Sequence, residues 1–286
     1  MPRVLEGKLA IVTGSSRGIG AAIAENLASK GANIVVNHTS PSSAEPAAAL
    51  AARLSAAHSV KTLVIRADLG TPDGPAQLVS RLLSALAADH PRNALGNPQI
   101  DILVNNAGVA INNKIADLSA ADFQRTYAVN VQGPLLLVQA VAPYLPTDRS
   151  GRLVSLSSIS ASTGFVGQSV YGGTKAAVEA MTRTWARELA ERCTANAVNP
   201  GPVEGPMYAA NTDEFKAGIR GWIEHAPLMR ARPGVDSDEV VEDAKTSGGR
   251  PAYASEVAGI VGMVCTPDAA WCTGQVVSAN GGMLMF

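Results

Sequence analysis

The chain has 286 residues, of which 47% are hydrophobic, and its 23 basic and 24 acidic residues give a net charge of −1. This composition is typical of a globular protein and excludes a disordered chain. The charges are well mixed, so neither a nucleic-acid partner nor a membrane surface is expected. The start "MPRVLEGK" is not expected to be a signal peptide, because the first apolar run is already a strand candidate. No apolar run reaches roughly 18 residues, and the three cysteines lack metal-ligand spacing. We therefore expect a soluble cytoplasmic protein without a metal site.

Short apolar runs alternate with longer helical patterns along the chain. The first run, residues 9–14, precedes a helix over 18–30 that ends near Gly31. This alternation predicts a single α/β domain over 1–286, with a doubly wound, parallel, seven-stranded sheet, buried strands and helices on both faces. The other predicted strands are 33–38, 61–68, 101–108, 151–158, 194–201 and 274–282; the other helices are 44–56, 74–88 and 169–191, and one more lies between the fourth and fifth strands.

Two segments interrupt this alternation. Residues 88–99 form a polar loop broken by proline and glycine. Residues 206–250 are charged and irregular, yet four apolar side chains follow the i, i+4, i+7, i+8 spacing of one face of an amphipathic helix: Phe215, Ile219, Trp222 and Ile223. Long ordered loops in compact domains are commonly binding loops, so we predict a helical lid over 206–250 that closes on substrate. A helix fixed to the body, or a subunit contact, is the alternative.

The stretch "TGSSRGIG", residues 13–20, joins the first strand to the first helix. A helix N-terminus offers unpaired N–H groups and the positive end of the helix dipole, which suit a phosphate. Gly14 allows the turn, while Gly18 and Gly20 allow backbone to approach a pyrophosphate and the helix to pack on the sheet. The spacing is G-x-x-x-G-x-G rather than the commoner G-x-G-x-x-G, and a plain turn is the alternative.

Further motifs occur in a fixed order after this turn. "NNAG" (105–108) ends the fourth strand, "VNVQG" (129–133) carries Asn130, Ser158 precedes Tyr171 by 13 residues, and "NPGPV" (199–203) ends the sixth strand. Together they resemble the short-chain dehydrogenase/reductase family, in the group of the 3-oxoacyl-carrier-protein and polyhydroxynaphthalene reductases. The resemblance runs from about Lys8 to Gly282 and implies a Rossmann-type fold.

Tyr171 and Lys175 lie four residues apart on one helix, so their side chains share a face. The lysine ammonium is expected to lower the phenol's pKa from its usual value of about 10, which makes Tyr171 a general acid/base. Ser158, at the end of a strand, can hydrogen-bond a substrate carbonyl. The resemblance implies that Asn130 holds a water linking Lys175 to solvent. The alternatives are a packed tyrosine, a solvated lysine, a turn serine and a capping asparagine.

A nicotinamide cofactor is implied by the resemblance. The resemblance implies that Asp68 contacts the adenine amino group and that Asn106 and Gly108 line the cofactor groove. It also implies that Lys175 binds the nicotinamide ribose and that Val203 lies along the nicotinamide. No acidic residue follows the second strand until Glu45, and Arg17 supplies positive charge, so NADP(H) is favoured over NAD(H). The full set of expected cofactor residues is Gly14, Ser16, Arg17, Gly18, Ile19, Gly20, Asn37, His38, Thr39, Ser40, Asp68, Leu69, Asn106, Ala107, Gly108, Tyr171, Lys175, Pro200, Gly201 and Val203.

The chain departs from the family pattern in three places. Gly205 stands where a threonine commonly contacts the carboxamide, which puts local cofactor binding or lid geometry in question. "YGGTK" has glycines where the family favours alanine and serine, and "SANGG" lacks the usual acidic residue before its paired glycines. The second change is not expected to alter the chemistry.

These features predict an NADPH-dependent enzyme that reduces the carbonyl group of a small molecule or natural product to an alcohol. The alternatives are an alcohol dehydrogenase, a relative recruited to isomerise or cyclise its substrate, and a cofactor-binding regulator without turnover. A homo-oligomer, a tetramer or dimer, is expected because the family pairs helices here at about 112–145 and 170–191 and because the end "GGMLMF" is apolar. Candidate substrate-lining residues are Val109, Ile111, Ser160, Phe165, Met207, Tyr208 and Trp222.

Overall fold

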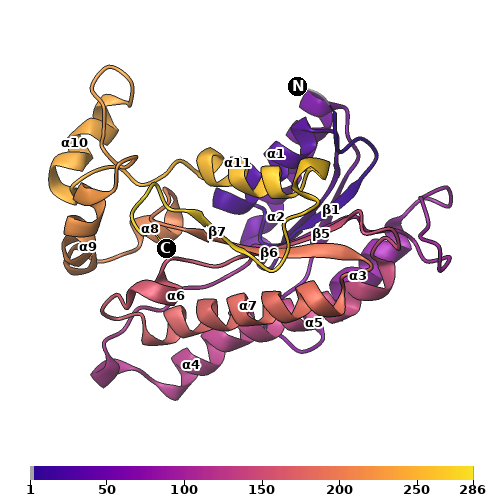
Figure 1. Cartoon of the computed structure of the whole chain (residues 1–286), viewed down its shortest axis with the longest axis horizontal. Coiled ribbons are helices and arrows are strands. Elements are labelled where there is room, and N and C mark those ends of the chain that lie inside the picture. Colours follow the sequence, from indigo (N-terminus) through magenta and orange to yellow (C-terminus); the bar gives the residue numbers. More distant parts are fainter. Residues whose placement is uncertain (1–2, 286) are drawn as a thin grey trace.

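The computed structural model describes residues 3–285 and contains one seven-stranded parallel sheet (Figure 1). The strand order is β3-β2-β1-β4-β5-β6-β7, so the winding direction reverses between β1 and β4. The predicted fold class is confirmed. The strands are β1 (Leu9–Val12), β2 (Asn33–His38), β3 (Thr62–Arg66), β4 (Ile102–Asn105), β5 (Gly151–Leu156), β6 (Cys193–Pro200) and β7 (Val276–Ala279).

Helices cover both faces of this sheet (Figure 1). One face carries α1 (Gly18–Ser29), α2 (Ala44–His58) and α11 (Ala254–Val264); the other carries α3 (Gly74–Ala85), α4 (Ala120–Tyr127), α5 (Gly133–Val141) and α7 (Ser169–Glu188). Each face of the sheet has its own hydrophobic core. Alternate residues of a strand contribute to the two cores, because successive side chains point to opposite faces. Val104 packs under Leu27 and Val261 of the first layer, whereas Leu103 packs with Leu137 and Trp185 of the second.

The strands end earlier than the sequence predicts. Residues 13–14, 106–108 and 157–158 are loops in the structure, although they continue the apolar or small-residue runs of β1, β4 and β5. Because the strands are parallel, these loops meet at one edge of the sheet, next to the point where the winding reverses. The expectation that every strand is buried is wrong for the edge strand β3, where Val64 is 40% exposed.

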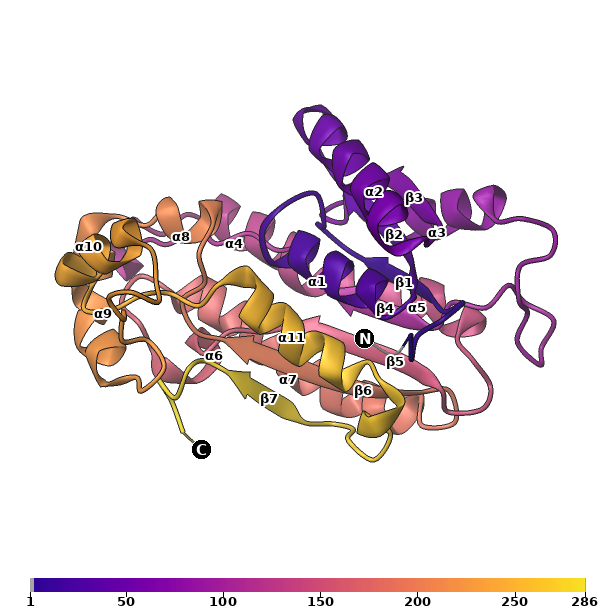
Figure 2. The same ribbon diagram turned by 90° about the horizontal axis from the view of Figure 1, so that it is seen from above.

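The segment 206–250 forms three helices: α8 (Pro206–Ala209), α9 (Asp213–His225) and α10 (Asp238–Ser247). Figures 1 and 2 place them together beyond the arrowheads of the central strands. The predicted amphipathic helix is α9. Thr212 caps its N-terminus, because the threonine hydroxyl accepts a hydrogen bond from Phe215 N. Ile219 and Ile223 are buried in a small core with Ile159, Met229 and Met283, but Trp222 is 42% exposed.

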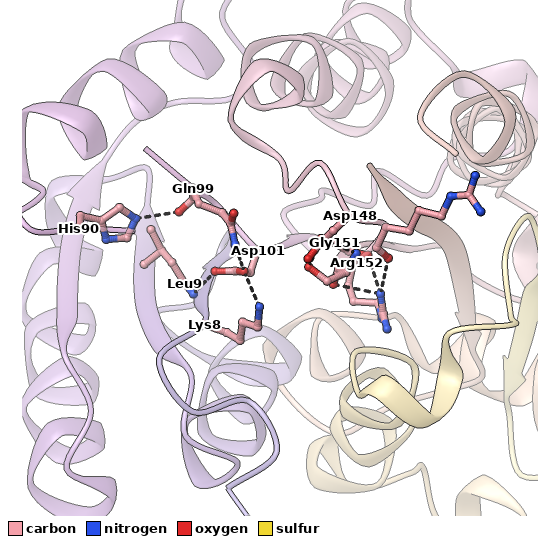
Figure 3. Close-up of polar contacts among 10 residues, drawn as sticks. Lys8, Leu9, His90, Gln99, Asp101, Asp148, Gly151 and Arg152 are labelled. Carbon is pink, nitrogen blue, oxygen red and sulfur yellow. Dashed lines mark hydrogen bonds and ion pairs between the residues drawn. The ribbon is translucent and has the colours of Figure 1, made fainter. Parts of the chain in front are cut away.

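The opposite edge of the sheet is held by polar contacts that do not reach the strand ends just described (Figure 3). The buried Asp101 carboxylate accepts hydrogen bonds from Leu9 N at 2.9 Å and from Gln99 at 2.8 Å, and it pairs with Lys8 at 3.0 Å. Arg152, also buried, donates to backbone carbonyls, including Gly151 O at 2.8 Å. Across residues 3–285, no helix has the length and apolarity needed to cross a membrane.

Candidate active site

A groove of about 640 Å³ runs over the carboxyl ends of the central strands and under the segment 206–250. It brings together the predicted site residues from both halves of the chain, except for Asn37 and Asn130. The predicted residues that line it are Gly14, Ser16, Arg17, Gly18, Ile19, Gly20, His38, Thr39, Ser40, Asp68, Leu69, Asn106, Ala107, Gly108, Ser158, Tyr171, Lys175, Pro200, Gly201 and Val203.

The glycine turn leaves backbone exposed to the groove. Gly14 and Gly18 have φ values of +60° and +58°, in the left-handed region that favours glycine. A β-carbon at Gly20 would lie 2.5 Å from Asn106 Nδ2 and 2.6 Å from Gly14 O, so only glycine fits there. Helix α1 begins at Gly18 without a side-chain cap, and an added β-carbon at Gly18 would meet open space. This open helix N-terminus fits a phosphate group.

Asn37 occupies a different place from the one expected. Its side chain is fully buried below the glycine turn: Oδ1 accepts from Gly14 N at 3.1 Å, and Nδ2 donates to Ile65 O and Ala67 O at 3.2 Å. A buried amide must find such partners, and here the backbone supplies them. Asn37 therefore supports the turn and does not line the groove. Asn106 has a related role, because its Nδ2 donates to Thr13 O at 2.8 Å.

The groove beyond β2 is lined by small polar groups. His38 Nδ1 lies 3.1 Å from Ser40 O, and Ser40 Oγ lies 2.8 Å from Ser43 Oγ. Ser43 lines the groove with Arg17 and was not predicted, although the run "SPSS" gave a signal for it. No carboxylate occurs between His38 and Ser43. This end can therefore accept an anionic group without charge repulsion.

Tyr171 and Lys175 share one face of α7 and are 9% and 6% exposed. Lys175 Nζ lies 5.6 Å from the centre of the Tyr171 ring and donates to Leu156 O at 2.7 Å. Ser158 follows β5 directly, and its hydroxyl lies 3.0 Å from Ser160 Oγ. The strand end and the helix thus bring a serine, a tyrosine and a lysine to the same part of the groove.

Burial dominates the pKa values of these groups. It raises the pKa of the Tyr171 phenol above its ordinary value, and the neighbouring Ser158 hydroxyl offsets part of that rise. Burial also lowers the pKa of the Lys175 ammonium to about 8. The expectation that lysine lowers the tyrosine pKa is therefore wrong for the protein without ligand, because removing the phenolate from water has the larger effect.

Asn130 lies in a π-helical turn, residues 128–132, between α4 and α5. Its buried amide exchanges two hydrogen bonds with Val109, at 2.9 and 2.8 Å, and donates to Thr174 Oγ1 at 3.1 Å. A β-carbon at Gly108 would lie 3.3 Å from Asn130 Oδ1 and 3.6 Å from Lys175 Nζ, so the two side chains flank Gly108. Asn130 thus lies beside the site, and its role in a water relay stays a prediction.

The substrate end of the groove lies under α8 and α9. Ile111 and Trp222, two of the candidates, are not among its lining residues. The polar residues Asn112, Gln168 and Asn211 here were not predicted, because they lie far apart in the sequence and belong to no common motif. Gly205 has a φ of +128°, which explains glycine in place of threonine at this position. The candidate residues that do line this end are Val109, Ser160, Phe165, Met207 and Tyr208.

The parallel sheet, the glycine turn at its switch point and the buried tyrosine–lysine pair define a Rossmann-type oxidoreductase. The chain belongs to the short chain dehydrogenase family, whose model matches residues 8–216. Over 99% of both chains it is 49% identical to the L-xylulose reductase of Aspergillus niger. It is 47% identical to the L-xylo-3-hexulose reductase of Hypocrea jecorina, over 100% of this chain and 99% of that protein.

Solved structures resemble the whole chain as well. A blue fluorescent protein from a metagenomic library, in complex with NADPH, has a TM-score of 0.80 at 30% identity and covers 98% of this chain and 99% of its own. A short chain dehydrogenase from Burkholderia cenocepacia, in complex with NADP, has a TM-score of 0.78 at 32% identity and covers 98% of each chain.

Proposed function

We propose that this protein uses NADPH to reduce the ketone group of a small polyhydroxylated molecule, a ketose, to an alcohol. The observation that carries the proposal is the group of Ser158, Tyr171 and Lys175 on one groove with the glycine turn. The two relatives named for ketose reduction, at 49% and 47% identity over nearly the whole chain, support the substrate class.

The cofactor proposal rests on the fit of the groove. The open N-terminus of α1 suits the pyrophosphate, and Arg17, Ser40 and Ser43 offer a cation and hydroxyls to a 2′-phosphate without a carboxylate nearby. Two similar solved structures hold NADPH or NADP, which agrees with this choice. Bound NADPH supplies the hydride for the reduction.

The chain's own residues supply the proton and hold the carbonyl. The raised pKa keeps Tyr171 Oη protonated at neutral pH, so the phenol enters a reduction as the general acid and donates its proton to the ketone oxygen. Ser158 Oγ hydrogen-bonds the same oxygen and favours the charge that develops on it. We assign Lys175 to the ribose of the nicotinamide half, and Asn130 to the water that returns a proton toward Lys175.

The test is the loss of NADPH absorbance with a panel of substrates. We expect oxidation of NADPH by L-xylulose or another ketose, with a higher kcat/KM than for NADH. Diketones and quinones in the same panel distinguish a general carbonyl reductase from a ketose reductase. Tight NADPH binding without turnover on any of these compounds would favour a regulator instead.

We also propose that the protein is a homo-oligomer, most simply a tetramer. Exposed apolar side chains on and beside α4 and α5, including Ile115, Phe123 and Leu135, support an association surface on that face. The apolar chain end gives support at one position only: Met285 is 76% exposed, whereas Met283 is buried in its own chain. Phe286 lies outside the described residues. Light scattering that gives the mass of one 29.4 kDa chain would contradict the proposal.

A further inference from the structure

Three amide side chains, linked by hydrogen bonds, cross the substrate end of the groove. Gln168 precedes α7, Asn112 lies in the loop after β4, and Asn211 lies between α8 and α9. Gln168 Nε2 points to Asn112 Oδ1 at a long 3.4 Å, and Asn112 Nδ2 donates to Asn211 Oδ1 at 3.1 Å. The three amides therefore connect the body of the molecule to the segment 206–250.

Two buried polar atoms at this end of the groove lack hydrogen-bond partners in the described part of the chain. Gln168 is 8% exposed, and within residues 3–285 nothing donates a hydrogen bond to its Oε1; the buried hydroxyl of Tyr208 is in the same situation. Leaving a buried polar group unpaired costs about 1–3 kcal/mol, so such atoms commonly mark a place where a ligand group completes the bonding. Both side chains line the groove. An unpaired acceptor and an unpaired hydroxyl on two side chains that line one groove suit a ligand that carries hydroxyl groups.

The position of Gln168 relative to Tyr171 fixes which part of a substrate it can reach. It is the N-cap residue of α7 and precedes Tyr171 by three residues, so its side chain starts about one helical turn before the tyrosine. In the proposed function Tyr171 and Ser158 hold the reacting oxygen, which leaves Gln168 for a hydroxyl group beside the ketone. The apolar side chains of Phe165, Met207 and Phe215 line the same end and offer no competing hydrogen bonds.

We infer that Gln168, with Asn112 and Asn211, binds the hydroxyl groups that flank the ketone and makes the enzyme specific for polyhydroxylated substrates. This inference rests on the proposed function. A site built to hydrogen-bond a substrate hydroxyl rejects an analogue that lacks it, because its own buried polar groups then stay unpaired. Gln168 is the central residue, since among the three amides its Oε1 is the buried atom that has no partner within residues 3–285.

The test compares L-xylulose with 2,3-pentanedione, a five-carbon substrate without hydroxyl groups, in wild type and in Gln168→Leu. The substitution keeps the side-chain size and removes no helix cap, because Gln168 makes no capping hydrogen bond to α7. We expect kcat/KM for L-xylulose to fall about 10- to 100-fold, mainly through KM, while the value for 2,3-pentanedione stays within threefold. Gln168→Glu keeps an acceptor and is expected to lose less.

Gln77→Leu, an exposed glutamine on α3 outside the groove, is the matched control and should leave both values unchanged. An equal fall on both substrates in Gln168→Leu, with weaker NADPH binding, would overturn the inference and indicate a structural role. Unchanged L-xylulose kinetics in that variant would overturn it too. A wild type that reduces 2,3-pentanedione but no ketose would instead defeat the proposed function.

Discussion

The two ends of the groove are built in different ways. At the glycine turn the shape depends on backbone: Gly14 and Gly20 sit where a β-carbon would collide, and Asn37 and Asn106 hold the loops from beneath. Under α8 and α9 the shape depends on side chains packed in a small core of their own. The first end therefore tolerates few substitutions and binds a constant ligand, whereas the second can change its lining without disturbing the sheet.

The contrast extends to the reacting groups, which lie between the two ends. Tyr171 and Lys175 stand on the longest helix, α7, and are buried against the sheet. Their neighbours belong to short elements at the side-chain end: Gln168 is the N-cap of α7, and Ser160 begins the four-residue helix α6 (Ser160–Thr163). A long helix thus holds the proton donor at one position, while the groups around the remainder of a substrate lie on short helices and the loops beside them.

The largest effect is expected on turnover, from a substitution at Tyr171, which lies between the two ends of the groove. Tyr171→Phe removes only the titrating hydroxyl, so we expect kcat to fall about 10²–10⁴-fold while NADPH affinity and thermal stability stay close to wild type. Steady-state kinetics and a fluorescence titration with NADPH measure the two properties. Turnover within threefold of wild type would remove Tyr171 from its role as general acid.

Substitutions at the glycine-turn end of the groove are expected to change the preference of the enzyme for NADPH over NADH. Arg17→Ala removes a cation that lines the groove together with the His38–Ser43 loop, so kcat/KM for NADPH should fall about tenfold or more while the value for NADH changes little. Adding His38→Asp should shift the ratio further toward NADH, because a carboxylate repels a 2′-phosphate. Arg187→Ala, an exposed arginine on α7 outside the groove, is the control. A ratio that both variants leave unchanged means that the 2′-phosphate lies elsewhere.

The buried lysine is expected to give the protein a pH-dependent stability. The pKa of Lys175 is lowered to about 8, so from about pH 8 to 10.5 the unfolded chain binds more protons than the folded one, and stability rises with pH. Relative to Lys175→Met, the wild-type free energy of unfolding should increase by about 1–2 kcal/mol between pH 7.5 and 9.5. Urea denaturation at both pH values measures this. A parallel pH dependence of the two proteins would argue against a depressed lysine pKa.

The smallest effect is expected on the hydrogen exchange of the segment 206–250, which covers the substrate end of the groove. If the segment 206–250 is a lid, hydrogen exchange across 207–250 should slow when NADPH and a substrate analogue bind, while exchange in β1 and β4 stays constant. Its contacts with the body include polar ones, such as Asn112–Asn211 and the exposed pair Lys114–Glu214. They also include the small apolar core that Ile219 and Ile223 form with Ile159 and Met283. Strong protection in the free protein that binding does not alter would identify a fixed element.

The sequence predicted the backbone-built end better than the other. Its signals are local: an apolar strand, glycines at set spacing, and a tyrosine–lysine pair on one helix. Asn37 was misplaced because pattern alone does not say toward which side of a turn an amide points. Gln168 and Asn211 gave no signal, since isolated amides in loops become a cluster only when distant segments meet. Trp222 fits the helical spacing of α9, yet it lies at the margin of the buried face and stays partly exposed.

The chain enters and leaves the segment 206–250 at neighbouring points. Val203 pairs with Ala252 in a parallel bridge, and the N–H groups of Glu204 and Ala252 donate across it at 2.9 Å. The segment is therefore a loop whose two ends lie close together. The entropic cost of closing such a loop depends weakly on its length and rises by about 0.6 kcal/mol for each doubling. A change in the length or the side chains of this one stretch thus alters the substrate end of the groove while β6, α7 and the tyrosine–lysine pair keep their places.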